Sequence, residues 1–378
     1  MRLNSIVAAV AGMAAAVLLA VPAGAVSRPD APGGDQFVLP APTGPYPVGW
    51  EALHVVDPDR PDPWAPPAPR ELMVSVWYPA AAARGPHVPY ATAEESRLML
   101  ESVGLTTVPS DSLTRVQTHA RIGTPPLPGR HRLPLVVLSP GLTDPRWMQT
   151  TLAEDLASRG YLVVAVDHPY EGAVVTLPGG RVVQSLMATL DPDGADIVAS
   201  RVRDLSLVLD RVLAHPRYGR MADPDRVAVV GHSMGGATAA ATLLADPRVD
   251  AGINLDGTFH HPPDRDLTRP FLMLGADPHP RPHQPGQDPT WDRTWPHLTT
   301  WGRWLYIPQM VHRSPSDVAV VGEWLGLAIQ PLPGARCVEI TRTYVAAFLD
   351  QHLRQRHQPL LDGPSPHFPE VQFVGATG

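Results

Sequence analysis

The sequence Gly-His-Ser-Met-Gly at 231–235 lies between a predicted strand and a predicted helix. The apolar run 227–230 precedes it, and the small residues of 236–241 follow it. In this order the pattern predicts a strand-turn-helix in which a strained turn presents the hydroxyl of Ser233. The glycines two positions either side of the serine remove Cβ atoms that would collide where strand and helix meet. The pentapeptide therefore predicts a nucleophilic serine.

Strands and helices alternate along the rest of the chain. Apolar runs or apolar-polar alternation predict strands, and apolar residues at helical spacing predict helices. The predicted strands are 72–78, 133–138, 161–166, 226–230, 251–255, 271–274 and 303–307, and the predicted helices are 149–158, 195–214, 235–245 and 339–355. This alternation predicts an α/β fold with a mostly parallel central sheet and helices on both faces.

The first 25 residues are typical of an export signal. Arg2 supplies positive charge, 6–21 is apolar, and Ala-Gly-Ala at 23–25 offers a cleavage site. We expect a secreted protein whose mature chain begins at Val26. The apolar run is shorter than the roughly 20 residues that span a bilayer, so no transmembrane segment is expected in the mature chain.

Proline content divides the remaining chain into expected segments. We expect a Pro-rich approach segment over 26–70, a catalytic domain over 71–357 and a C-terminal tail over 358–378. Cys337 is the single cysteine, so an internal disulfide is excluded and stability must come from the size of the core.

The charged residues exclude several classes of function. The chain has 30 basic and 37 acidic residues, and loss of Arg2 with the signal changes the net charge from -7 to -8 (29 - 37). A nucleic-acid partner is not expected for such an acidic protein. The sequence contains no lysine, which excludes a Schiff-base lysine, a P-loop lysine and a Ser-Lys dyad. The base that activates Ser233 must therefore be a histidine.

The base and the acid are expected downstream of Ser233. An imidazole must accept the serine proton, and a carboxylate must hold that imidazole in the correct tautomer. His312 follows the last predicted strand, 303–307, and is the best placed histidine. Asp256 and Asp277 each end a strand. Asp256 is favoured because Pro278 restricts the orientation of the preceding carboxylate, that of Asp277. Asp277 stays open as the alternative acid.

Two stretches resemble a known family. Residues 134–168 read PLVVLSPGLTDPRWMQTTLAEDLASRGYLVVAVDH, and residues 231–257 read GHSMGGATAAATLLADPRVDAGINLDG. Both are similar to the plasma-type, calcium-independent platelet-activating factor acetylhydrolases, a family of α/β-hydrolases, and to their bacterial relatives. The resemblance extends loosely from about 73 to 353. It implies an early acid in a Leu-Asp pair such as 255–256, and a base in a short loop such as 309–316.

Two backbone N–H groups should stabilise the oxyanion of the reaction. One belongs to the residue after the nucleophile, Met234, and the other to Leu142 in the loop after the strand 133–138. The family usually has a histidine where Pro140 stands. Because proline donates no hydrogen bond, the turn is kept but one support of this loop is absent.

These observations predict a secreted serine ester hydrolase that forms an acyl-serine intermediate. We expect short or modified acyl esters as substrates, among them acetylated phospholipids, with transient contact to a lipid surface. A cutinase-like lipase or polyester hydrolase is the alternative, and a non-catalytic binding protein with the same fold is a third. No cofactor and no metal ion are expected, because no C-x-x-C pair and no i, i+4 histidine pair on a predicted helix suggests a site.

The tryptophans of 291–304 allow two interpretations. Trp291, Trp295, Trp301 and Trp304 could line an acyl or lipid-facing pocket, or they could pack a surface loop on the core. The sequence does not decide between them.

Overall fold

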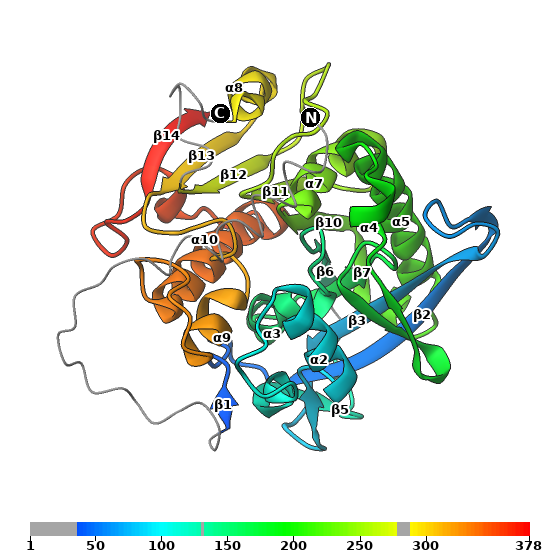
Figure 1. Cartoon of the computed structure of the whole chain (residues 1–378). Helices are drawn as coiled ribbons and strands as arrows, with labels where there is room; N and C mark the ends of the chain where they lie inside the picture. The colour runs from blue at the N-terminus through cyan, green and yellow to red at the C-terminus, as the bar shows by residue number, and fades with distance from the viewer. Residues whose placement is uncertain (1–35, 130–131, 278–287) are drawn as a thin grey trace, which may run out of the picture.

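A single large sheet with helices on both faces forms the centre of the protein (Figure 1). The computed structural model describes residues 36–129, 132–277 and 288–378. The expected export signal, 1–25, lies outside these residues. The predicted α/β architecture is confirmed.

The sheet is parallel at its centre and has antiparallel pairs on both sides of this centre, while β5 pairs in parallel with β1 and β2 near one edge. Over the described residues its spatial order is β1-β5-β2-β3-β7-β6-β10-β11-β12-β13-β14, with β4 beside β5. From β7 to β13 in this order, every pair of neighbouring strands is parallel. The pairs β2–β3, β3–β7 and β13–β14 are antiparallel. The bounds are β1 Phe37–Val38, β2 Val48–Pro61, β3 Pro69–Pro79, β4 His87–Pro89, β5 Val116–Ile122, β6 Leu133–Ser139, β7 Leu162–Asp167, β10 Ala222–His232, β11 Ala251–Leu255, β12 Phe271–Ala276, β13 Gly302–Ile307 and β14 Gln372–Thr377.

Helices cover the two faces of this sheet. They are α2 Ala93–Ser102, α3 Thr150–Ser158, α4 Met187–Leu190, α5 Gly194–Ala214, α6 Tyr218–Met221, α7 Met234–Ala245, α8 Pro289–Thr294, α9 Val318–Trp324 and α10 Gly334–Arg354. Alternate residues of β6 show the two layers. Val136 and Leu138 share a core with α3 and α10, whereas Leu135 and Val137 share one with α5 and α7. Both faces of the central strands are thus buried, as their continuous apolar sequences require.

The ends of the chain contribute to the sheet more than we expected. Instead of a separate approach segment and tail, β2 pairs with β3 from Val48 onward, and β14 pairs with β13. The expected boundaries at 71 and 357 therefore do not separate structural units. Pro58 is accommodated because the β2–β3 register shifts between Asp57 and Pro61, which leaves this residue outside the paired positions.

Two local features also differ from the predictions. Helix α10 begins at Gly334 rather than 339, because the Glu323 carboxylate accepts the Gly334 N–H at 2.6 Å and satisfies a first-turn donor. The irregular stretch after β7 contains a separate hairpin of β8 Val174–Leu177 and β9 Arg181–Gln184. Over the residues that the structure describes, no helix has the length and apolarity needed to cross a membrane.

Candidate active site

Ser233 occupies the sharp turn between β10 and α7. Its φ of 55° and ψ of -122° are strained for a residue with a side chain. The Ser233 N–H donates to the Leu255 carbonyl at 2.9 Å, which ties the turn to the neighbouring strand β11. A Cβ atom on Gly231 would lie 1.9 Å from the Gly235 carbonyl oxygen, so this close approach requires glycine. The predicted nucleophile elbow geometry is present.

Asp256 directly follows β11 and is fully buried. Its φ of 56° turns the chain, and its N–H donates to the Leu274 carbonyl at 2.8 Å. Oδ1 accepts the Ala276 N–H at 2.7 Å. One carboxylate oxygen is therefore fixed by the backbone of β12, and the other is held toward the loop after β13.

His312 lies in that loop and links Asp256 to Ser233. The His312 Nδ1 is 2.7 Å from Asp256 Oδ2, and its Nε2 is 2.8 Å from Ser233 Oγ. An ionised carboxylate can only accept hydrogen bonds, so Nδ1 carries the proton and Nε2 accepts the serine hydroxyl. With the His312 side chain 32% exposed, the pair of Ser233 and His312 is open to an incoming molecule.

Asp277 has a different place from the one an acid needs. It accepts the Tyr306 hydroxyl at 2.8 Å, and its N–H donates to the Met310 carbonyl at 2.7 Å. Since Nδ1 of His312 is bound to Asp256, Asp277 instead braces the start of the loop that carries His312.

A second polar group lies behind the His312 loop. His232 is 2% exposed, and its Nε2 donates to the His312 carbonyl at 2.6 Å. Its Nδ1 lies 3.3 Å from Asp144 Oδ2, and Arg313 pairs with Asp144 Oδ1 at 3.1 Å. Burial acts to raise the pKa of the Asp144 carboxyl, but the charge of Arg313 and then His232 outweigh it and lower this pKa to about 2. Sequence reasoning assigned no role to His232, Asp144 or Arg313.

Leu142 and Met234 lie at the same edge of the sheet. Leu142 belongs to the loop that follows β6, and Met234 is the first residue of α7, where the N–H has no acceptor within the helix. A Cβ atom on Gly141 would lie 3.1 Å from His232 Nδ1, so this loop lies against the elbow. The role of the two N–H groups as oxyanion donors stays a prediction.

The tryptophans of 291–304 pack on the core. Trp291 and Trp304 are at most 1% exposed, with ring centroids 5.7 Å apart, and the Trp291 Nε1 donates to the Gly257 carbonyl at 2.8 Å. Trp295 is tilted against Trp304, and Trp301 packs on Phe348 of α10. This cluster therefore supports the strand ends, and the interpretation as a lipid-facing surface is wrong for Trp291 and Trp304.

Two family models match the sequence. The model of the platelet-activating factor acetylhydrolase, isoform II, matches residues 34–179, and the model of the alpha/beta hydrolase family matches residues 136–374, more than half of the chain. The chain belongs to the alpha/beta hydrolase family. The resemblance to the acetylhydrolases inferred from the sequence is confirmed.

Several named proteins are similar to this alpha/beta hydrolase. A protein of Arthroderma benhamiae, described as a probable 1-alkyl-2-acetylglycerophosphocholine esterase, is 30% identical over 379 residues, which cover 90% of this chain and 94% of the relative. A cutinase of Thermobifida alba is 32% identical over 145 residues, 38% of this chain and 41% of the cutinase. A ferulic acid esterase from Streptomyces cinnamoneus has a solved structure with a TM-score of 0.81 and 42% identity, covering 90% of this chain and 100% of the esterase. All three are named as carboxylic ester hydrolases, and the predicted ester-hydrolase function of this family member is confirmed.

Proposed function

We propose that this alpha/beta hydrolase cleaves esters through an acyl-Ser233 intermediate. Ser233 Oγ attacks the ester carbonyl carbon while His312 Nε2 takes the hydroxyl proton, and the same imidazole then protonates the leaving alcohol. A water molecule, activated by His312, releases the acid and restores the serine. Asp256 holds the imidazole in the required tautomer. The observation that supports this most is the hydrogen-bonded chain from Asp256 through His312 to Ser233.

The oxyanion of each tetrahedral intermediate would be bound by the N–H groups of Leu142 and Met234. Their side chains belong to an apolar cluster with Met187, Ile197 and Ala237. This cluster excludes water from one side of the oxyanion position, and hydrogen bonds to a developing charge are stronger in such an environment. The apolar wall also favours a substrate whose acyl group is small or apolar.

We propose short or modified acyl esters as substrates, with the acetyl group of phospholipids as the first candidate. Its support is the similarity to the Arthroderma benhamiae protein, which covers 94% of that relative. Esters of ferulic acid are a second candidate, because the Streptomyces cinnamoneus esterase is 42% identical over its full length. Polyester, as for the cutinases, has weaker support, since that similarity covers 38% of this chain.

A substrate panel tests these candidates. We expect p-nitrophenyl acetate to give the highest kcat/KM in a series of p-nitrophenyl esters of increasing chain length. An acetylated phospholipid, methyl ferulate and a polyester film should be assayed beside it. The phospholipid is supplied both as monomers and in vesicles, so that a higher rate on vesicles reports contact with a lipid surface. Faster cleavage of long-chain esters than of acetate would contradict the short-acyl proposal.

We also propose that the protein is exported and cleaved after Ala25. The support is the sequence of the first 25 residues, with Arg2 before an apolar run and a small-residue cleavage site. The protein is expressed with residues 1–25 in a bacterium related to Streptomyces or Thermobifida. It is then expected in the culture medium with Val26 as its first residue. N-terminal sequencing or intact mass measures this. Retention in the cells with residues 1–25 intact would contradict it.

A further inference from the structure

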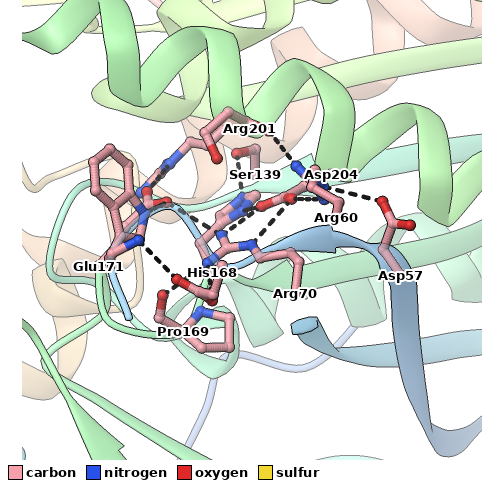
Figure 2. Close-up of polar contacts among 12 residues, drawn as sticks. Asp57, Arg60, Arg70, Ser139, His168, Pro169, Glu171, Arg201 and Asp204 are labelled. Carbon is pink, nitrogen blue, oxygen red and sulfur yellow. Dashed lines mark hydrogen bonds and ion pairs between the residues drawn. The ribbon is translucent and has the colours of Figure 1, made fainter. Parts of the chain in front are cut away.

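A buried cluster of charged residues lies where α5 contacts the loop after β6 (Figure 2). The buried arginine cluster, as we call it, consists of Arg70, His168, Glu171, Arg201 and Asp204, whose side chains are at most 1% exposed. Arg60 and Asp62 border it and pair with Asp204 and Arg70. Arg60, Arg70 and Arg201 face the three carboxylates Asp62, Glu171 and Asp204, and Asp57 also pairs with Arg60. Burying so many charges is costly unless each has partners.

The cluster does not have the character of a metal site. His168, Glu171 and Asp204 could together present ligand atoms to an ion. However, Arg70 donates to Asp204 Oδ2 at 2.6 Å and lies 3.3 Å from Glu171 Oε1, while Arg201 Nε donates to Glu171 Oε2 at 2.6 Å. Guanidinium groups already supply the positive charge that these carboxylates need. The cluster must therefore be explained by what its arginines contact.

Arg201 reaches from α5 to the loop after β6. Its NH1 group donates to the Pro140 carbonyl at 2.6 Å, and its NH2 group lies 3.5 Å from the Gly141 carbonyl oxygen. The same guanidinium is fixed from the other side by Glu171. One planar, always charged fork thus joins a buried carboxylate to two successive carbonyl groups of the loop that carries Leu142.

Two further contacts hold the same loop. The Thr143 N–H donates to the Glu171 carbonyl at 3.2 Å, and the Ala173 N–H donates to the Thr143 carbonyl at 2.9 Å. Before the loop, Ser139 Oγ lies 3.3 Å from His168 Nε2. Burial, and then the charge of Arg201, lower the pKa of His168, so its neutral ring donates from Nδ1 to Asp204 and accepts the Ser139 hydroxyl at Nε2. The loop is therefore tied to the cluster before, within and after Gly141.

Because the peptide unit is planar, the contacts that hold the Gly141 carbonyl also fix the direction of the Leu142 N–H. The Gly141 carbonyl and the Leu142 N–H belong to one trans peptide, so they point in opposite directions. Arg201 and the Asp144 N–H, at 3.2 Å, hold that carbonyl. If this peptide flipped, a carbonyl oxygen would replace the N–H and would repel a developing oxyanion.

We propose that Arg201 is a positioning residue for the oxyanion site: it holds the peptides of Pro140 and Gly141 so that the Leu142 N–H faces the reacting carbonyl. The inference rests on the proposed function, in which Leu142 is an oxyanion donor. Arg201 also supports the loop at Pro140, which has no side-chain donor of its own. Arg201 acts through Leu142 and has no contact with the substrate.

Replacement of Arg201 by lysine tests this role. Lysine keeps the charge and can pair with Glu171, but it lacks the fork that binds Glu171 and Pro140 together. We expect kcat of Arg201→Lys on p-nitrophenyl acetate to fall about 10- to 100-fold with KM within threefold, since loss of a complete oxyanion donor costs about 10²- to 10³-fold. The inhibition constant of a trifluoromethyl ketone, whose adduct with Ser233 places an oxyanion in the same site, should rise by the same factor.

Arg70→Lys is the matched control. Arg70 is equally buried and donates to the Pro169 carbonyl at 3.1 Å instead of Pro140, so its replacement disturbs the cluster without touching the oxyanion loop. We expect a similar fall in melting temperature for both variants, but kcat of Arg70→Lys within threefold of the wild type.

Three results would overturn the inference. They are an unchanged kcat in Arg201→Lys, an equal loss of kcat in Arg70→Lys, or a change in KM alone. If Arg201→Lys does not fold, the variant Arg201→Gln, which removes the charge but keeps an NH2 donor, is measured in the same way. Measurements on the wild type separate this inference from the proposed function. If the wild type hydrolyses esters without forming the Ser233 adduct, the proposed function is contradicted, whatever the Arg201 variants do.

Discussion

Replacing Ser233 with alanine is expected to lower kcat on p-nitrophenyl acetate by about 10⁵- to 10⁶-fold, because the attacking oxygen is lost. Alanine keeps the Cβ atom of serine, so the strained backbone at φ 55° bears no additional crowding. The thermal unfolding of Ser233→Ala should therefore match that of the wild type. Initial rates, corrected for the uncatalysed reaction, measure the loss.

Labelling with a fluorophosphonate gives a second measurement of the same point. The wild type should gain one adduct, which peptide mass spectrometry places on Ser233, and Ser233→Ala should gain none. Ser206→Ala is the control. Ser206 lies on α5, and its hydroxyl donates to Asp246 at 2.8 Å, so this variant should be labelled like the wild type. An adduct on Ser233→Ala, or ester hydrolysis near the wild-type rate, would show that another group is the nucleophile.

Local sequence signals account for much of the fold and of the candidate site. The elbow could be predicted because Gly231 is required by a contact within a few residues of Ser233, the carbonyl oxygen of Gly235. Gly235 is required by a distant contact, since a Cβ atom there would lie 2.0 Å from the Ser139 carbonyl oxygen. His312 could be placed because a short loop follows β13, and strand order fixes the edge at which that loop lies. The three residues expected to act together, Ser233, Asp256 and His312, do form one hydrogen-bonded chain.

What the sequence could not show depends on pairing between distant segments. β2 contains prolines and charges typical of a loop, and its strand conformation comes from β3 and from the bulge after Asp57. β14 likewise needs β13 as its partner. Local patterns do not encode such partners, because a strand of this kind is stabilised by the ladder that it joins.

The sequence of α5 does contain a signal for the buried arginine cluster. Arg201 and Asp204 fall on the same stripe of α5 as Leu205 and Val208, at the i, i+3, i+4 and i+7 spacing of the buried face. Charged residues on an apolar stripe indicate paired charges in the interior. Their partners Arg70 and Glu171 come from β3 and from the segment after β7, so only the fold could identify them.

The assignment of the acid predicts a large difference between two conservative variants. Asp256→Asn is expected to lower kcat by about 10⁴-fold. The Ala276 N–H takes the amide oxygen, so the amide NH2 faces Nδ1 of His312, which must then accept, and the imidazole takes the wrong tautomer. Asp277→Asn should stay within about fivefold of the wild type. An amide oxygen can still accept the Tyr306 hydroxyl, and the backbone N–H of residue 277 keeps its bond to the Met310 carbonyl. Steady-state kinetics on p-nitrophenyl acetate measures both.

The two variants also separate catalysis from packing. Asp256 Oδ1 accepts the Ala276 N–H, and asparagine can keep this bond through its carbonyl oxygen, so Asp256→Asn should remain folded while losing activity. A loss of activity that followed the unfolded fraction would point to a structural role instead. The assignment is wrong if Asp277→Asn loses about 10⁴-fold in kcat while Asp256→Asn is nearly normal. With Nδ1 of His312 held 2.7 Å from a fully buried Asp256, we expect the opposite order, because Asp256 rather than Asp277 is hydrogen-bonded to the imidazolium as it forms.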